Sequence, residues 1–292
     1  MSAVVHAFAE DLAPAGRLAD AMGLALRQVD LHRFPDGESL PTVPPGDPTV
    51  LVYRSLDRPD AKIVPLLLAC DAWRRTGTRR LVLVAPYLPY LRQDKAFLPG
   101  QPLSRDVLGG LLGECFDRIV TVEPHLHRTR TLDGVFNIPV TSLSSAAVLA
   151  GAFQASDRWL VVGPDVEAEP WARALAHELR TDFVCFRKQR RGDAAVDLRL
   201  DESVDVKARR VLLVDDICSS GATLALAASI LRRRGAAHIE VAVAHALFGA
   251  KAGVRLSEAG VARVVSTDSC AHPTNSVGLA PLLAAALHDE LS

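Results

Sequence analysis

The chain has 292 residues, 49% of them hydrophobic, and a formal net charge of −1 at pH 7. This length suits two domains of ordinary size, each able to bury a core. The balanced charge provides no general attraction to nucleic acid or membrane surfaces, so any anion must be bound by a local cluster of side chains. No apolar run approaches the ~20 residues of a membrane span, and the N-terminus lacks a signal pattern, so we expect a cytoplasmic protein.

Short β-like runs alternate with helical patterns along the chain. The clearest predicted strands are Val50–Arg54, Arg80–Pro86, Arg118–Glu123, Trp159–Gly163, Phe183–Phe186, Arg210–Asp216, Ile239–Ala244 and Ala262–Ser266. Helical patterns lie between them at Ala61–Thr76, Arg105–Glu114, Pro170–Leu179 and Leu224–Arg234. This alternation predicts an α/β protein with mainly parallel sheets flanked by helices, and with ligands at the carboxyl ends of the strands.

The alternation is interrupted near residues 140–157, where serines and a glycine cluster. We therefore predict an N-terminal domain over residues 1–147 and a C-terminal domain over residues 148–292. The final segment, Leu279–Leu291, reads as an amphipathic helix that can pack on either half. No strict repeat is visible, although two similar sheets would suit an old duplication.

The five cysteines, at 70, 115, 185, 218 and 270, have no paired or metal-type spacing. We expect reduced and mostly buried thiols.

The segment Arg33-Phe-Pro-Asp-Gly-Glu38 combines turn chemistry with an aromatic ring. Phe34 beside Asp36 and Glu38 offers a flat face and two acceptors, which suit an adenine ring and its amino group. On local physics alone a plain surface turn is favoured, because Pro-Asp-Gly is a strong turn sequence.

Charged segments follow two further predicted strands. Arg92-Gln-Asp-Lys95 follows the strand at residue 80, where Arg92 and Lys95 can neutralise a polyphosphate and Gln93 can bind a base or phosphate. The simpler alternative is a solvated loop. His125 and His127 follow the strand at residue 118, and two histidines without cysteine partners are too few for a zinc site. One histidine at a Mg²⁺ or triphosphate site is the better interpretation.

Two segments of the C-terminal half also follow predicted strands. Asp165 ends the strand Trp159–Gly163 and can hold Mg²⁺ or ribose hydroxyls, although an ordinary turn aspartate has the same pattern. Arg187-Lys-Gln-Arg-Arg191 precedes a glycine and has few apolar anchors, which is typical of a loop that closes over phosphate or of a solvated hairpin tip. Arg232–Arg234 reads as ordinary basic residues at a helix end.

The most informative stretch is Val211–Thr223, in which an apolar strand runs into Asp215 and Asp216 and then into a loop of small and hydroxyl residues. A helix pattern follows. A strand end, a glycine loop and a helix N-terminus together form an anion site, since free N–H groups and the helix dipole point at the ligand. No lysine follows the glycine, so this is not a Walker loop.

This stretch resembles the phosphoribosyl-pyrophosphate (PRPP) loop of type I phosphoribosyltransferases and PRPP synthetases. Taken in order, the segments resemble the ribose-phosphate pyrophosphokinase (PRPP synthetase) family over nearly the whole chain. Tyr90-Leu-Arg-Gln-Asp-Lys95 is similar to that family's ATP segment, Phe136-Asn-Ile-Pro139 to its Phe-x-Ile-Pro, and Lys188-x-Arg190 to its catalytic loop. The resemblance implies two phosphoribosyltransferase-type domains, the first binding ATP and the second ribose 5-phosphate.

The resemblance also implies roles for individual residues. ATP would be bound by Phe34, Asp36, Gly37, Glu38, Arg92, Gln93, Asp94 and Lys95. Ribose 5-phosphate would be bound by Asp215, Asp216, Ser219, Ser220, Gly221, Ala222 and Thr223. Mg²⁺ would be held by His125 and Asp165, with Lys188 and Arg190 as catalytic residues. The Phe34 turn would reach a neighbouring subunit's site, which implies a homo-oligomer, with no nucleic-acid or membrane partner.

The chain departs from the family pattern at three places. Glu123-Pro124 stands for the usual Asp-Leu, and Val166–Ala168 stands where small glycines are common. Ala222 replaces the last glycine of the loop, which an alanine can do only at negative φ. Two alternatives therefore stay open: a non-catalytic homologue that binds nucleotide and regulates a synthetase, and a type I phosphoribosyltransferase, which would need no ATP segment.

Overall fold

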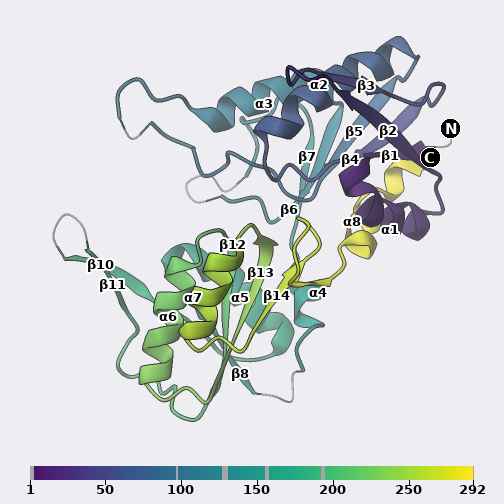
Figure 1. Ribbon diagram of the computed structural model, residues 1–292. Coiled ribbons are helices and arrows are strands. Elements are labelled where there is room, and N and C mark those ends of the chain that lie inside the picture. Colours follow the sequence, from purple (N-terminus) through teal and green to yellow (C-terminus); the bar gives the residue numbers. More distant parts are fainter. Residues whose placement is uncertain (1–2, 97, 127–130, 155–157, 192–194, 292) are drawn as a thin grey trace. The chain divides into compact units, whose positions relative to one another are not determined.

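The protein is described by a computed structural model that covers residues 3–96, 98–126, 131–154, 158–191 and 195–291, with the backbone alone at 188–191 and 195–197 (Figure 1). The chain forms two compact units. Unit 1 comprises Met1–Leu143 and Leu279–Ser292, and unit 2 comprises Ser144–Gly278. Each unit is built on a mainly parallel sheet flanked by helices, which confirms the predicted α/β class.

Unit 1 holds a seven-stranded sheet in the order β3-β2-β1-β4-β5-β6-β7. All neighbouring strands are parallel except β2 and β3. Its elements are β1 Ala3–Phe8, η1 Ala9–Asp11, α1 Leu12–Met22, β2 Leu26–Arg33, β3 Ser39–Thr42, β4 Thr49–Tyr53, α2 Asp60–Arg75, β5 Arg80–Ala85, α3 Ser104–Cys115, β6 Arg118–Val122, β7 Val140–Leu143, α8 Ala280–Ala286 and η4 His288–Leu291.

Unit 2 holds a six-stranded sheet in the order β15-β14-β13-β12-β8-β9, parallel throughout, and a separate antiparallel pair of β10 and β11. Its elements are α4 Ala146–Ala150, β8 Trp159–Gly163, η3 Val166–Ala168, α5 Glu169–Leu179, β9 Phe183–Cys185, β10 Arg187–Arg191, β11 Ala195–Arg199, β12 Arg210–Cys218, α6 Ala222–Arg233, β13 His238–Ala246, α7 Ala250–Glu258, β14 Arg263–Thr267 and β15 Asn275–Val277.

The two sheets have the same topology. In unit 1 the parallel strands run β2-β1-β4-β5-β6-β7, and in unit 2 they run β9-β8-β12-β13-β14-β15. In both, the chain order reverses beside the first strand, between β1 and β4 and between β8 and β12. Such a switch point is where open parallel sheets bind ligands, because the flanking loops diverge there. The insertions after the second strand differ: unit 1 adds β3 and unit 2 adds the β10–β11 hairpin.

The central strands of these sheets are short apolar runs buried on both faces, as expected when helices cover a parallel sheet. β5 is buried from Leu81 to Ala85, and β8 is buried over its whole length. Close approach of strands needs a glycine at one point. A Cβ on Gly163 would lie 2.7 Å from Cys185 Sγ, so the end of β8 can pack beside β9 only without a side chain.

The structure differs from the sequence-based expectations at four places. The final segment is a short helix, α8, followed by the 3-10 turn η4, because Arg80 and Arg118 hold Glu290 beyond the helix end. Within unit 1, α8 packs against α1. Helix α6 begins at Ala222, two residues before the predicted start. Residues Arg187–Arg191 form a strand, and the strands of the first 49 residues were not among those predicted.

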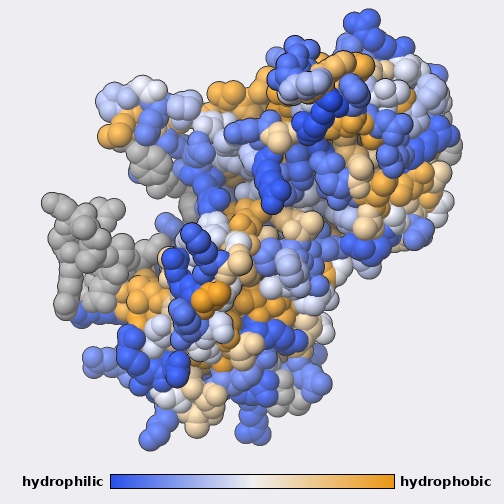
Figure 2. All heavy atoms as spheres, in the orientation of Figure 1, coloured by the Kyte–Doolittle hydropathy of each residue, from blue (hydrophilic) through white to orange (hydrophobic). Residues whose placement is uncertain are grey.

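Within the described residues, no helix is long and apolar enough to cross a membrane. Several apolar side chains are nevertheless exposed on unit 1. Val64 and Leu68 lie one turn apart on α2, and Val107 and Leu111 one turn apart on α3. Figure 2 shows hydrophobic side chains along this edge of unit 1, over α2 and α3. An apolar surface on neighbouring helices is typical of a protein–protein contact.

Candidate active site

The loop between β12 and α6 stands at the switch point of unit 2. Asp215 and Asp216 lie in the last part of β12, and Ser219 and Ser220 follow as exposed residues. The N–H of Ala222 donates to Ser220 Oγ (3.3 Å), and Arg255 Nη1 from α7 donates to the carbonyl oxygen of Ser220 (2.9 Å). The loop is therefore fixed at one point, with the first turn of α6 directly behind it.

Gly221 and Ala222 explain how this loop tolerates an alanine. Gly221 is in the left-handed region (φ +67°), which favours glycine, and it precedes the helix. Ala222 is the first residue of α6 and is absent from the described residues with positive φ. The requirement for negative φ at Ala222 is therefore met. Gly221 is the position of this loop whose left-handed backbone favours glycine.

The switch point of unit 2 concentrates negative charge. Asp165 follows β8 and is buried, and its Oδ1 accepts the N–H groups of Glu167 (2.9 Å) and Ala168 (3.3 Å). Burial raises the pKa of Asp215 well above its usual range, and the nearby carboxylates of Asp216 and Asp165 raise it further. The three carboxylates are thus close enough to repel each other. A cation or a set of hydroxyl donors would relieve this repulsion.

Lys188 and Arg190 lie on the hairpin that unit 2 inserts after its second parallel strand. Their backbone belongs to β10, which pairs with β11 so that Lys188 opposes Leu198 and Arg190 opposes Val196. The positions of these two side chains lie outside what the structure describes. The segment that was expected to be a loop or a hairpin tip is a hairpin strand, and residues 192–194 at its tip are not described.

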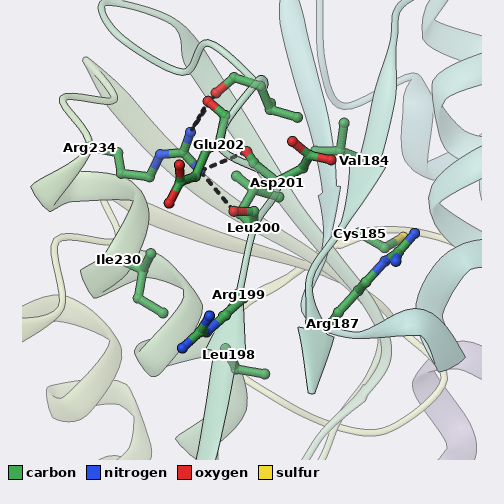
Figure 3. Close-up of a pocket in the computed structure, with 11 residues that line it drawn as sticks. Val184, Cys185, Arg187, Leu198, Arg199, Leu200, Asp201, Glu202, Ile230 and Arg234 are labelled. Carbon is green, nitrogen blue, oxygen red and sulfur yellow. Dashed lines mark hydrogen bonds between the residues drawn. The ribbon is translucent and has the colours of Figure 1, made fainter. Parts of the chain in front are cut away.

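A cavity of about 1000 Å³ lies at the base of this hairpin (Figure 3). Arg234, which the sequence presented as an ordinary helix-end residue, donates to the carbonyl oxygens of Leu200, Asp201, Glu202 and Val204. Arg187 points toward Cys185, and Arg199 points toward Ile230 on α6. Because the two arginines point apart, they do not form one anion site. Arg234 holds the segment that leads from the hairpin back to β12.

In unit 1 the segment Arg92–Lys95 follows β5 and is held between the starts of two helices. Ser104 Oγ, at the start of α3, donates to Gln93 Oε1 (2.5 Å), and the N–H of Arg105 donates to the Gln93 carbonyl oxygen (3.5 Å). Tyr90 has a positive φ of 62°, and its hydroxyl donates to Asp60 at the start of α2. Arg92 and Lys95 are exposed, and Asp94 is half-buried. The basic side chains are therefore presented on an anchored turn.

The Phe34 segment is the turn between β2 and β3. The N–H of Phe34 donates to the Glu38 carbonyl oxygen (2.9 Å), and the N–H of Glu38 donates to Asp36 Oδ1 (3.1 Å). Gly37 has a φ of +96°, as the turn requires. The ring of Phe34 is exposed, and it forms a T-shaped pair with the ring of His32, with centroids 4.5 Å apart. This turn presents an aromatic face that the unit itself does not bury.

His125 follows β6, two residues after Glu123, which has a φ of 39°. The positive φ turns the chain at the carboxyl end of the strand and leaves His125 half-buried there. His127 lies outside the described residues. Among the residues that the structure does describe, no group of three or more His, Cys, Asp or Glu side chains is arranged to hold a metal ion.

The lack of a complete set of protein ligands among the described residues is compatible with Mg²⁺. Mg²⁺ keeps several waters and binds through one or two carboxylates plus substrate phosphates. The oxygen donors of Asp165 and Asp215, with excess negative charge between them, are the ligand type that this ion prefers. The residues present therefore fit the expected metal.

Three anchoring residues were missed in the sequence. Arg255 contacts the loop between β12 and α6 from 35 positions away, Asp60 holds the Arg92–Lys95 segment through Tyr90, and Ser104 holds it through Gln93. No local pattern marks such contacts, because they depend on the packing of separate helices. The sequence analysis placed Asp165, Asp215 and Asp216 each at the end of a predicted strand, and the structure has them near one another.

Both halves of the chain match known protein families. Residues 6–115 match the N-terminal domain of ribose phosphate pyrophosphokinase, and residues 143–281 match the phosphoribosyl transferase domain. The ribose-phosphate pyrophosphokinase of Methanopyrus kandleri is 34% identical over 292 residues, covering 98% of this chain and 99% of the relative. That of Thermococcus kodakarensis is 34% identical over 263 residues, covering 89% and 92%.

A solved structure agrees with the sequence relatives. The phosphoribosylpyrophosphate synthetase of Mycobacterium smegmatis superimposes with a TM-score of 0.85 and 26% identity, covering 99% of both chains. The two-unit fold and the full-length relatives agree. The chain belongs to the ribose-phosphate pyrophosphokinase family.

Proposed function

We propose that the protein is a ribose-phosphate diphosphokinase that converts ATP and ribose 5-phosphate to PRPP and AMP. The anomeric hydroxyl of the sugar attacks the β-phosphorus of ATP, the bond between the β-phosphorus and the oxygen of AMP breaks, and the diphosphoryl group moves to O1. Its full-length relatives carry the name of this activity. In such transfers a protein acts mainly by positioning its substrates and stabilising charge.

The observation that carries the proposal is the loop at the switch point of unit 2. The 5-phosphate would lie on the N-terminus of α6, where Ser219, Ser220 and Thr223 offer hydroxyls beside backbone N–H groups. Arg255 holds this loop through Ser220 (2.9 Å) and so preorganises it. The carboxylates of Asp215 and Asp216, just before the loop, would accept hydrogen bonds from the sugar hydroxyls.

The nucleotide would be bound by unit 1. Arg92 and Lys95 would neutralise the triphosphate, with Gln93 and Asp94 completing the polar contacts of an anchored turn. Lys188 and Arg190, on the hairpin of unit 2, would be the catalytic cations that stabilise the transferring diphosphoryl group.

Mg²⁺ would supply charge neutralisation of the nucleotide phosphates when bound. His125 and the nucleotide phosphates would hold one ion, and Asp165 would hold a second on the sugar side. Asp165 is suited to this role because its Oδ1 is already fixed by the N–H groups of Glu167 and Ala168. The carboxylate therefore needs little reorganisation to bind a hydrated cation.

The base of the nucleotide would be recognised by the Phe34 turn of a second copy of the chain. The exposed ring of Phe34, with Gly37 shaping the turn and Asp36 and Glu38 beside it, suits a flat base with an amino group. The exposed apolar side chains of α2 and α3 support self-association. A homo-oligomer follows from this arrangement.

One assay separates this proposal from its alternatives. The purified protein is incubated with ATP, Mg²⁺ and ribose 5-phosphate, and AMP and PRPP are followed together. We expect both products in equal amounts. Nucleotide binding without products would identify a regulatory homologue, and consumption of added PRPP with a nucleobase would identify a phosphoribosyltransferase.

A further inference from the structure

Unit 1 contains two cysteines that face each other between α2 and α3. Cys70 is buried on α2, on the same helix face as Leu66 and Trp73. Cys115 is the last residue of α3, on the face of Leu112, and is half-buried. Cys70 belongs to the apolar core of unit 1 and Cys115 packs against the same core, where the two side chains perturb each other's pKa.

A third residue links the two helices beside these cysteines. Arg74 lies one turn after Cys70 on α2, and its Nη2 donates to the Cys115 carbonyl oxygen (3.3 Å) and to Asp117 Oδ2 (3.0 Å). The guanidinium thus joins α2, one turn after Cys70, to the end of α3 at Cys115. Asp117 and Glu114 are the carboxylates of this region.

The two thiols differ in their chemistry. The hydrogen bond from Cys70 lowers the pKa of Cys115 to about 7, with Arg74 adding to the effect and burial and Glu114 opposing it. The same hydrogen bond, together with burial, raises the pKa of Cys70 well above its usual range. Cys115 is therefore the more nucleophilic and the more accessible of the two, and Cys70 is a protonated thiol held beside it.

We propose that Cys70 and Cys115 are an oxidation-sensitive pair, in which a peroxide oxidises Cys115 and Cys70 then closes a disulfide between α2 and α3. In the first step the Cys115 thiolate attacks one oxygen of hydrogen peroxide, an S–O bond forms, the O–O bond breaks and hydroxide leaves. In the second, the Cys70 sulfur attacks Cys115, the S–S bond forms, the S–O bond breaks and water leaves. Peroxide is reduced, and both sulfur atoms are oxidised.

The disulfide would act on the nucleotide segment through the two helices that it joins. The start of α2 holds Tyr90 through Asp60, and the start of α3 holds Gln93 through Ser104. A covalent link near the other end of α3 restricts how these anchors move relative to each other. This effect on nucleotide binding rests on the proposed function, whereas the disulfide itself does not.

Peptide mapping of the oxidised protein tests the disulfide. The unaltered chain is treated with hydrogen peroxide, remaining thiols are blocked, and the peptides are identified by mass spectrometry. We expect a peptide pair linked through Cys70 and Cys115 that disappears on reduction. Sulfinic acid at Cys115 with a free Cys70 thiol, or a link to another cysteine, would overturn the proposal.

Variants then assign the two roles. Cys70→Ser should leave Cys115 to accumulate as sulfenic acid, which is trapped by dimedone, and Cys115→Ser should leave Cys70 unoxidised. Cys185→Ser is the matched control, because Cys185 is also half-buried but burial raises its pKa to about 11. The thiol of Cys115 should react at least about tenfold faster than that of Cys185 at pH 7. Equal rates would overturn the assignment.

The coupling to nucleotide is measured separately. The affinity for ATP is determined before and after oxidation, in the unaltered chain and in Cys115→Ser. We expect oxidation to change the affinity at least about fivefold in the unaltered chain only. A linked Cys70–Cys115 peptide with unchanged ATP affinity would overturn the coupling. Loss of ATP binding in both oxidation states would instead count against the proposed function.

Discussion

The switch points of the two sheets have the same topology but opposite chemistry. In unit 1 the position between β1 and β4 is filled by Arg54, whose side chain is fully buried. Its Nη1 lies 2.8 Å from Asp11 Oδ2 and 2.8 Å from Glu10 Oε1, and its guanidinium stacks on Phe8 at 4.1 Å from the ring centroid. The carboxylates at this point of unit 1 are thus paired with a cation of the chain itself.

In unit 2 the equivalent position, between β8 and β12, carries Asp165, Asp215 and Asp216 and leads into the loop between β12 and α6. Here burial, and after it the neighbouring carboxylates of Asp216 and Asp165, raise the pKa of Asp215. The same fold therefore has two different switch points. In unit 1 the internal cation Arg54 occupies it, and in unit 2 the carboxylate charge favours an external ligand. The side chains at the strand ends, and not the fold, determine whether a switch point favours a ligand.

The largest effect is expected at the inserted hairpin, which has no counterpart in unit 1. Lys188→Ala should lower kcat by about 100- to 1,000-fold with little change in ATP affinity, because the ammonium would act on charge that develops in the transition state. Steady-state kinetics and equilibrium nucleotide binding check this split. Arg191→Ala is the matched control on the same strand. Comparable losses of turnover and affinity would mean that Lys188 serves ground-state binding.

A second prediction tests the internal cation of unit 1. Arg54→Met removes the charge but keeps an unbranched side chain, so Asp11 is left buried without its ion-pair partner. The free energy of unfolding should fall by about 3 kcal/mol, which urea denaturation measures. Arg27→Met is the control, because Arg27 also pairs with an aspartate but is exposed. A loss as small as that of the control would show that Arg54 does not close this switch point.

Glu290→Gln tests a buried charge that fastens the C-terminus to unit 1. Glu290 accepts from Arg80 Nε (2.5 Å) and Nη2 (2.7 Å) and from Arg118 Nη1 (2.9 Å). The substitution should cost about 2 kcal/mol of stability at neutral pH. These arginines lower the pKa of Glu290 in the folded state, so its contribution is fully present above the unfolded value near 4.5 and is lost as the pH falls through the folded value.

The pH profile is therefore the diagnostic measurement for Glu290. Unaltered protein and Glu290→Gln should differ in stability at pH 7 and converge in acid. Asp289→Asn is the control, because Asp289 pairs with Arg118 from an exposed position and should change stability much less. A constant difference between the two proteins at all pH values would contradict this account of the pairing.

The smallest effect is expected at Asp215, where the substitution should raise the stability instead of lowering it. The pKa of this carboxyl is raised in the folded state, so the folded protein keeps its proton above pH 3.8 while the unfolded chain loses it. Stability therefore falls as the pH rises from 3.8 through the folded value. Asp215→Asn should abolish this loss and stabilise the protein by about 1 kcal/mol at pH 7, while weakening ribose 5-phosphate binding.

Thermal unfolding at several pH values, with ribose 5-phosphate titration, checks both parts. Leu213→Ile is a conservative control on the same strand. If Asp215→Asn were destabilising at pH 7, the carboxyl would be compensated in the folded protein, and the contrast with Arg54 would disappear.

The sequence predicted the strand–loop–helix units of both halves because each strand is a short apolar run with a polar end. It placed Asp165, Asp215 and the 219–223 loop together for the same reason, since the ends of parallel strands meet at one edge. It did not reveal Arg54 as an internal cation, because Arg54 ends a predicted strand and its partners at Glu10 and Asp11 lie 43 or more positions away. Long-range partners such as Arg255 and Ser220, or Cys70 and Cys115, also leave no local pattern.

The contrast between the switch points is tested most directly by hydrogen exchange with and without ribose 5-phosphate. The backbone amides of residues 219–225, in the loop and the first turn of α6, should exchange more slowly when the sugar phosphate is bound. The amides of residues 54–62, at the equivalent place in unit 1, should not change. Protection at residues 54–62, or none at residues 219–225, would contradict the assignment of the sugar-phosphate site to unit 2.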